Sequence, residues 1–234
     1  MPVYQLEETI AFPPPQLARE DGLLAVGGDL SLERLILAYQ LGIFPWYSPG
    51  EPILWWSPDP RLVLYPDELH ISRRLARTIR QGRFRLTYDQ DFAGVIVACA
   101  STRSLNRPGT WLDDQMIEAY GRLHQAGYAH SVECHQGDRL AGGLYGVAMG
   151  AVFFGESMFS LEPDASKVAL AGLVAALRKQ GYRLIDCQVK TEHLARMGAR
   201  EISGDMFFTQ LREGLTINRH ELRPGRWGSP EVGR

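Results

Sequence analysis

The chain has 234 residues, of which 45% are hydrophobic and 22% charged, so wholesale disorder is excluded. Its net charge is −2, and its apolar runs are short and interrupted, so no membrane span is predicted. Three cysteines without CxxC spacing argue against a disulfide framework or a zinc ribbon, and with no N-terminal signal pattern they favour the cytoplasm.

The predicted elements begin in a turn-rich segment that is dense in Pro and Gly up to residue 60. Its one clear helix spans Ser31–Gln40, where apolar side chains recur at helical spacing before Gly42. Beyond it, strands are predicted over 62–65, 84–88, 129–134, 140–148, 151–156 and 182–189, and helices over 71–80, 92–100, 113–125, 165–180, 192–197 and 205–213.

The order of strand, hairpin, long helix and strand in the second part of the chain is typical of one α/β (α+β) architecture. It is the Gcn5-related acetyltransferase-like fold, in which a mixed central sheet splays open around an acyl donor. We therefore predict a small turn-rich N-terminal domain over residues 1–62 and an acetyltransferase-like catalytic domain over residues 63–234.

The segment that would hold the pyrophosphate of coenzyme A argues against acetyl-CoA as the donor. In the acetyltransferase fold, a glycine-containing loop opens the helix that follows the hairpin. Residues 161–167 stand there in this chain, and they contain two acidic residues and no glycine. A coenzyme A-dependent N-acetyltransferase stays open as an alternative that binding of acetyl-CoA would support.

Positive charge is concentrated in one short segment. Residues 1–69 contain three basic and ten acidic residues, whereas residues 70–88 contain six arginines and no acid. On the helix predicted over 71–80, the stripe of Ile71, Leu75 and Ile79 lies opposite arginines. A polyanion that contacts this one place would explain the pattern, and a solvated helix face is the alternative.

Tryptophans beside Pro and Gly are candidates for nucleotide binding. Trp46, the pair Trp55-Trp56 and Trp111 stand in such surroundings, where an indole can stack on a base. Packing between domains is the alternative, above all for Trp55-Trp56.

Two acidic positions are candidates for chemistry. The period of two along a strand places Asp186 and Gln188 on one face of the strand predicted over 182–189. An acid within an apolar strand is costly unless it has a structural partner or serves the function of the protein. Glu156 stands at the apolar end of the predicted hairpin, where a buried carboxylate could receive a cationic ligand or pair with an internal arginine.

Taken together, several long motifs resemble those of the bacterial leucyl/phenylalanyl-tRNA–protein transferase family. The resemblance extends over nearly the whole chain. The motifs are GLLAVGGDL at 22–30, GIFPW at 42–46, ILWWSPDPR at 53–61, GTW at 109–111, GGLYG at 142–146, FGESMFS at 154–160 and LIDCQ at 184–188.

The resemblance implies an aminoacyltransferase that moves Leu or Phe, and less readily Met, from aminoacyl-tRNA to the N-terminal Lys or Arg of acceptor proteins. The new N-terminal residue would mark the acceptor for degradation. Because the donor is already an activated ester, the reaction needs no ATP, metal or other cofactor. Positioning then supplies most of the catalysis. A cytoplasmic monomer without membrane contact is expected.

The matching positions imply a role for each candidate residue. Asp186 and Gln188 would be catalytic, with Asp186 orienting Gln188 rather than abstracting a proton, because an ordinary Asp is a weak base. The implied acceptor site is Glu156 and Tyr120, with Glu156 on the acceptor's cationic side chain, and the implied site for the 3′-adenosine of the tRNA is Trp46 and Trp111. The implied donor side-chain pocket is Leu144, Phe153, Met158, Leu170, Leu173, Leu177 and Ile185, and the implied phosphate contacts are Arg73, Arg74, Arg77, Arg80 and Arg83.

One further hypothesis is a non-catalytic RNA-binding module that uses only the arginines and tryptophans. It leaves Asp186, Gln188 and the apolar pocket unexplained.

Overall fold

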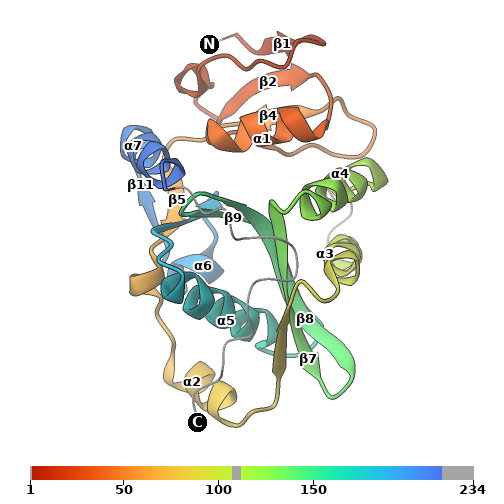
Figure 1. Ribbon diagram of the computed structural model, residues 1–234, viewed down its shortest axis with the longest axis vertical. Helices are drawn as coiled ribbons and strands as arrows, with labels where there is room; N and C mark the ends of the chain where they lie inside the picture. Colours follow the sequence, from red (N-terminus) through yellow and green to blue (C-terminus); the bar gives the residue numbers. More distant parts are fainter. Residues whose placement is uncertain (1, 107–111, 218–234) are drawn as a thin grey trace.

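The computed structural model describes residues 2–106 and 112–217, which build two β-sheets and the helices around them (Figure 1). The smaller sheet has the strand order β1-β2-β4-β3 and lies beside helix α1 (Leu32–Gln40). Its strands are β1 (Tyr4–Leu6), β2 (Leu23–Gly27), β3 (Phe44–Pro45) and β4 (Leu54–Trp56).

Helix α1 confirms the predicted helix, whereas the four strands around it were not predicted. Ser31 caps the helix, since its side chain accepts a hydrogen bond from the backbone N–H of Arg34. The strands have only two to five residues each and belong to a segment that is rich in Pro and Gly. Such short runs show no alternating pattern, and pairing with neighbours decides their structure.

The larger sheet has seven strands in the order β11-β5-β10-β9-β8-β7-β6. Strands β9 and β10 pair in parallel and the other neighbours pair antiparallel, so the predicted mixed sheet is confirmed. The strands are β5 (Arg61–Leu64), β6 (Arg85–Tyr88), β7 (Ala129–Gln136), β8 (Arg139–Met149), β9 (Val152–Ser160), β10 (Leu184–Gln188) and β11 (Arg200–Ile202).

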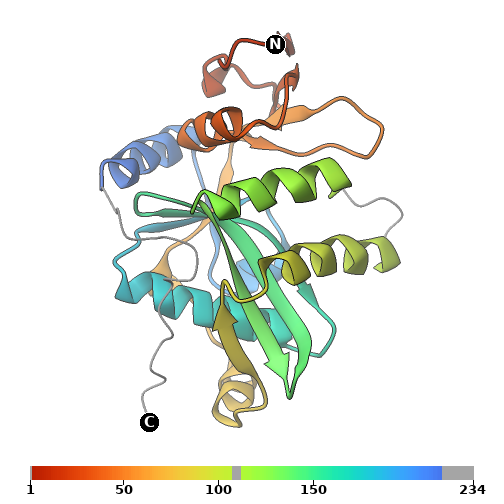
Figure 2. The same cartoon turned by 45° about the vertical axis from the view of Figure 1, so that its right-hand side comes forward.

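Helices cover both faces of this sheet (Figures 1 and 2). Alternate residues of a strand serve opposite faces, so Phe154 joins the buried cluster with α3 and α4, and Phe153 joins the cluster with α5. The helices are α2 (Arg73–Arg80), α3 (Phe92–Asn106), α4 (Asp114–Gln125), α5 (Ala165–Lys179), α6 (Glu192–Arg196) and α7 (Gly204–Leu215), with short 3₁₀ turns at Pro15–Leu17 and Pro66–Glu68.

Helix α2 is shorter than predicted and has a narrower apolar face. It begins at Arg73 because the side chain of Ser72 accepts the N–H of Leu75 as a cap. Of the predicted stripe, Leu75 is buried, whereas Ile71 and Ile79 are 40% and 39% exposed. The three-residue strand β11 was not predicted, and elsewhere in the catalytic part the differences lie at the ends of elements, since α3 continues to Asn106 and β9 to Ser160.

One buried cluster joins the two sheets. Trp55 and Tyr39 of the N-terminal segment share it with Phe154 of β9 and Phe207 of α7. The division at residues 62 and 63 stays a prediction. Within residues 2–106 and 112–217, no helix combines the length and the apolar character needed to cross a bilayer.

Trp55 tests the contribution of the N-terminal segment to this shared cluster. The side chain is fully buried, and its Nε1 donates a hydrogen bond of 2.9 Å to the carbonyl of Gly27. We expect Trp55→Ala to lower the free energy of unfolding by about 3–5 kcal/mol, measured by urea denaturation. Ile10→Ala, at a residue 44% exposed, should change it by less than about 0.5 kcal/mol. Equal effects would contradict this account.

Candidate active site

A largely apolar cavity of about 280 Å³ lies where β3, the strands β8–β10 and helix α5 meet. Leu170 and Leu173 of α5 form one wall, and Phe44 of β3 contributes from the N-terminal segment. The structure brings nine of the predicted site residues to this one cavity, namely Trp46, Leu144, Phe153, Glu156, Met158, Leu170, Leu173, Ile185 and Gln188.

Three residues that were predicted for the donor pocket, the acceptor site or catalysis do not line the cavity. Leu177 of α5 is fully buried in the core. It lies one turn beyond Leu173, where the helix has passed the end of the cavity. Its expected place in the pocket is therefore wrong. Tyr120 and Asp186 lie behind the cavity wall. Trp111 lies outside the described residues.

Gln188 reaches the cavity because the end of β10 departs from regular strand geometry. Its φ is +63°, in the left-handed region, and the pairing of β10 with β5 shifts register between Asp186 and Gln188. Gln188 therefore lines the cavity together with Cys187, whereas Asp186 does not. The expectation that Asp186 and Gln188 share one face of a regular strand is wrong.

Asp186 is held by a buried arginine from the neighbouring strand β5. Arg61 donates to both carboxylate oxygens, with Nε to Oδ1 at 2.8 Å and Nη2 to Oδ2 at 2.6 Å, and both residues are at most 1% exposed. The guanidinium also lies against the rings of Phe44 and Phe207. Oδ1 of Asp186 accepts the backbone N–H of Gln188 at 2.9 Å, which stabilises the unusual backbone there.

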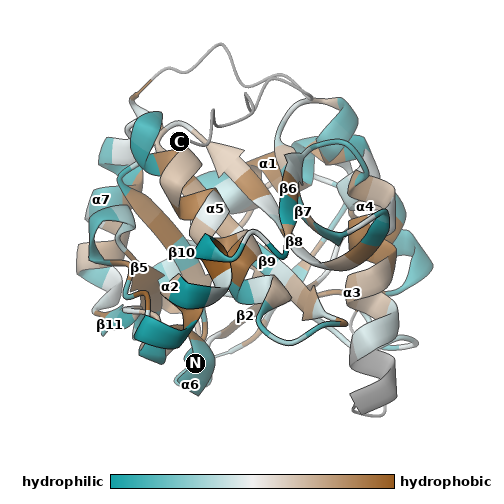
Figure 3. Cartoon of the chain, turned by 90° about the horizontal axis from the view of Figure 1, so that it is seen from below, coloured by the Kyte–Doolittle hydropathy of each residue, from teal (hydrophilic) through white to brown (hydrophobic). Residues whose placement is uncertain are grey.

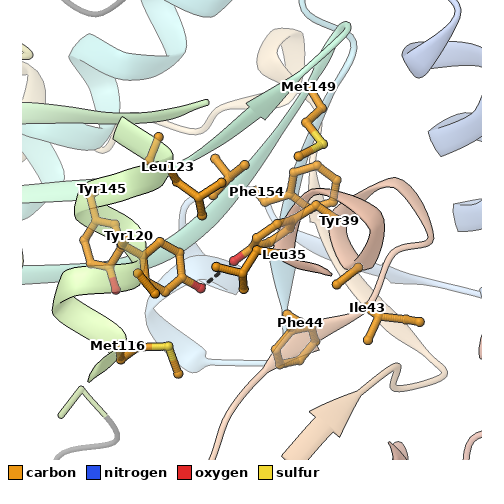
Figure 4. Packing of buried hydrophobic residues seen from close by; sticks show 14 of the residues in the cluster. Leu35, Tyr39, Ile43, Phe44, Met116, Tyr120, Leu123, Tyr145, Met149 and Phe154 are labelled. Atoms are coloured by element: carbon orange, nitrogen blue, oxygen red, sulfur yellow. Dashed lines mark hydrogen bonds between the residues drawn. The ribbon is translucent and has the colours of Figure 1, made fainter. Parts of the chain in front are cut away.

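Among the described residues that line the cavity, Glu156 is the one with a carboxylate. Its Oε1 accepts a hydrogen bond of 2.9 Å from Nε2 of Gln188, and its Oε2 accepts one of 2.8 Å from the hydroxyl of Tyr120. The Tyr120 hydroxyl makes a short hydrogen bond to that of Tyr39 (Figure 4). Glu156 therefore belongs to a hydrogen-bond network with residues of α1, α4 and β10, and it has no ion pair with an arginine among the described residues.

Burial sets the acidity of this network. It raises the pKa of Glu156 to about 7, while hydrogen bonds from Tyr120 and Tyr39 oppose the rise. Burial also raises the pKa of both tyrosines well above the ordinary value, and the nearby Glu156 adds to the effect. The phenols therefore remain neutral donors at neutral pH.

The cavity rim carries an aromatic surface. Trp46 is 43% exposed, and its ring lies 5.8 Å from that of Trp56, whose Nε1 donates to the Trp46 carbonyl. Trp55, by contrast, is core, as the packing alternative held.

The predicted arginines lie on α2 and in the turn after it, and much of α2 has the colour of hydrophilic residues in Figure 3. Arg74 pairs with Asp164 at the start of α5, with a distance of 2.9 Å between Nη2 and Oδ2. The side chains of Arg73, Arg77, Arg80 and Arg83 are exposed.

Sequence reasoning missed Arg61, Tyr39 and His193. An arginine at the start of an apolar strand was a usable signal for Arg61, but nothing local pointed to a partner 125 positions away. Tyr39 was assigned to the apolar stripe of the helix predicted over 31–40, so its hydroxyl was not considered as a site group. His193 lines the cavity, its buried Nε2 atom has no hydrogen-bond partner among the described residues, and burial lowers its pKa.

Across the part of the chain that the structure describes, no group of three or more His, Cys, Asp or Glu side chains is arranged to hold a metal ion. What the cavity offers is an apolar volume with a carboxylate and an amide at one end.

Comparison with known proteins identifies the family. The sequence profile described as "Leucyl/phenylalanyl-tRNA protein transferase" matches residues 63–212, and that of the N-terminal domain of the same family matches residues 28–59. The chain belongs to the leucyl/phenylalanyl-tRNA–protein transferase family. Membership makes it an enzyme, an aminoacyltransferase, as the sequence motifs predicted.

The similar proteins of this family align over almost the whole chain. The leucyl/phenylalanyl-tRNA–protein transferase of Anaeromyxobacter sp. (strain Fw109-5) is 57% identical over 97% of this chain and 95% of that protein. The one of Syntrophobacter fumaroxidans is 59% identical over 92% of both chains.

Solved structures show much weaker similarity. A GCN5-related N-acetyltransferase from Kribbella flavida aligns with a TM-score of 0.40 and 10% identity over 76% of this chain and 63% of that one. L-PGS from Bacillus licheniformis aligns with a TM-score of 0.41 and 12% identity over 84% of this chain and 74% of that one. The family assignment rests on the sequence relatives.

The raised pKa of Glu156 predicts how stability depends on pH. The folded state binds this proton more tightly than the unfolded chain, whose Glu has a pKa near 4.5, so the free energy of unfolding falls as pH rises from there through about 7. Glu156→Gln should therefore be more stable than the parent at pH 8, by up to about 3 kcal/mol, and lose this advantage below pH 4.5. Urea denaturation at both pH values measures it; a difference independent of pH would contradict the prediction.

The Arg61–Asp186 pair predicts a non-additive pair of substitutions. Arg61→Met leaves a buried carboxylate unpaired and should lower the free energy of unfolding by about 3–5 kcal/mol. Adding Asp186→Asn removes that charge, so the double variant should be more stable than Arg61→Met alone. Denaturant unfolding of the single and double variants measures this, and additive losses would refute the pairing.

Proposed function

We propose that this aminoacyltransferase moves Leu or Phe, and less readily Met, from aminoacyl-tRNA to the N-terminal Lys or Arg of acceptor proteins. The relatives' names specify leucyl and phenylalanyl donors. The observation that carries the proposal is the cavity itself: an apolar volume of about 280 Å³ with Glu156 and Gln188 at one end.

The cavity walls support the donor part of the proposal. Leu144, Met158 and Leu170 offer apolar contacts to a Leu, Phe or Met side chain, and such contacts distinguish these donors from charged ones. The exposed indole of Trp46 on the rim suits the 3′-adenosine of the tRNA, a contact that Trp111 would complete.

The arginines of α2 supply the remaining tRNA contact in this proposal. Exposed Arg73, Arg77, Arg80 and Arg83 can bind phosphates, while the ion pair to Asp164 leaves Arg74 a weaker candidate. Phosphate contacts carry no sequence information and weaken with salt. They therefore suit an enzyme that accepts tRNAs of more than one amino acid.

The acceptor would enter beside Glu156. A carboxylate there attracts the cationic N-terminal residue, Lys or Arg, and Tyr120 holds that carboxylate from behind. The amide of Gln188 points its N–H toward Glu156, which leaves its carbonyl oxygen to accept a hydrogen bond from the incoming amine.

Asp186 acts in this proposal as a positioning residue. Its carboxylate is bound to Arg61 and to the backbone N–H of Gln188, so it fixes the conformation in which Gln188 faces the cavity. This favours the orienting role over proton abstraction by Asp186. Asp186→Ala would then abolish transfer and leave tRNA affinity nearly unchanged.

We further infer a monomer that acts in the cytoplasm without a cofactor. The ester of the donor already supplies the free energy of the peptide bond, so transfer needs no ATP. The Leu or Phe added to the acceptor would serve as an N-terminal degradation signal.

The direct test of the proposed function is a transfer assay with the purified protein. Radiolabelled Leu-tRNA is mixed with a peptide that begins with Arg and, separately, with the same peptide beginning with Asp. We expect label only on the Arg peptide, because Glu156 repels an acidic N-terminal side chain. Tight tRNA binding without transfer from Leu-, Phe- or Met-tRNA would instead support a non-catalytic RNA-binding module.

A further inference from the structure

We propose that Glu156 is the general base of the transfer, which takes the proton from the acceptor's α-ammonium group. This inference rests on the proposed function and assigns the proton that the reaction must remove. It differs from a purely electrostatic role, in which Glu156 would only attract the cationic side chain of the acceptor.

Position is the first argument. Among the residues that line the cavity in the described part of the chain, Glu156 is the one carboxylate. It lies 2.9 Å, from Oε1 to Nε2, from the amide of Gln188. An amine that donates to the carbonyl oxygen of Gln188 from the side that faces Glu156 can therefore reach this carboxylate as well. A general base must lie within such reach of the proton it abstracts.

The second argument is that Asp186, the other buried acid here, is already engaged. It is fully buried, Arg61 binds both of its oxygens at 2.6–2.8 Å, and it does not line the cavity. The carboxylate of Asp186 is the counter-charge of the buried Arg61 guanidinium, and breaking a buried ion pair is costly. Asp186 therefore holds the site in place and does not exchange the proton.

The third argument is that the basicity of Glu156 matches its substrate. Burial raises the pKa of this carboxyl to about 7, and an α-ammonium group has a pKa of about 7.7–8.0. The charged and titratable groups around it act in both directions, because Tyr120, Tyr39 and Arg61 lower the pKa and Asp186 raises it. Proton transfer between nearly matched groups suits catalysis near neutral pH.

The proposed step balances as follows. Glu156 takes one proton from the α-ammonium, and the neutral amine attacks the ester carbonyl carbon, so that a C–N bond forms. The bond between that carbon and the ribose oxygen then breaks. The leaving oxygen takes the second proton from the nitrogen and departs as the hydroxyl of the tRNA. Glu156 afterwards releases its proton to solvent, which is the net proton of the reaction.

The test compares the parent enzyme with Glu156→Gln, which keeps the size and shape of the side chain and one of its two acceptor oxygens but cannot take a proton. At saturating Arg peptide, we expect kcat to fall by about 10²–10⁴-fold at pH 7. The remaining rate should rise about tenfold per pH unit up to the pKa of the amine. In the parent the rate should level off near pH 7.

Glu133→Gln is the matched control. Glu133 is a fully buried glutamate on β7, which β8 separates from β9. It is hydrogen-bonded to the hydroxyls of Ser131 and Thr87, and it does not line the cavity. The same change at this position should leave the pH profile of transfer unchanged. Transfer by the parent enzyme tests the proposed function, and the comparison of the variants tests the general base. Failure of one can therefore be distinguished from failure of the other.

A smaller variant adds a readout that a structural role would not produce. In Glu156→Ala, added formate can occupy the vacated space, and we expect it to restore transfer in proportion to its concentration. The assignment is overturned if Glu156→Gln keeps kcat and its pH profile and only raises the KM for the Arg peptide. In that outcome Glu156 binds the acceptor and does not exchange its proton.

Discussion

The buried ion pair between Arg61 and Asp186 is the interaction on which the rest of the site depends. It joins β5 to β10, and the rings of Phe44 and Phe207 pack on the guanidinium from the N-terminal segment and from α7. Two buried charges are stable only while they remain paired and hydrogen-bonded. Because Asp186 also holds the backbone of Gln188, the packing of the protein and the geometry of its cavity are coupled at this point.

The two buried carboxylates on the neighbouring strands β9 and β10 have opposite surroundings. Asp186 has a full counter-charge and no access to the cavity, whereas Glu156 has neutral donors and faces the cavity. The proposal that Glu156 exchanges a proton while Asp186 stays a fixed anion depends on this separation of environments. Gln188 connects the two, since its backbone binds Asp186 and its side chain binds Glu156.

Much of this was predictable from the sequence, and the remainder required contacts between distant segments. Helical spacing predicted α1, and the motif residues converge on one cavity from β8 to β10 and α5. The left-handed backbone at Gln188 could not be foreseen, because it depends on a register shift against β5. Nor could the sequence predict that Arg61 is the partner of Asp186, because the two residues are far apart in the chain. The exclusion of Leu177 from the cavity was also unpredictable, because only the folded chain shows where the cavity ends.

The central claim is that this cavity holds the donor's side chain with its carbonyl beside Gln188 and Glu156. A crystal structure with a non-hydrolysable leucyl-adenosine amide tests it most directly. The account predicts the leucyl side chain against Leu144, Met158 and Leu170, the adenine on Trp46, and the carbonyl carbon within reach of an amine bound at Gln188. An analogue bound elsewhere, with the cavity unfilled, would contradict it.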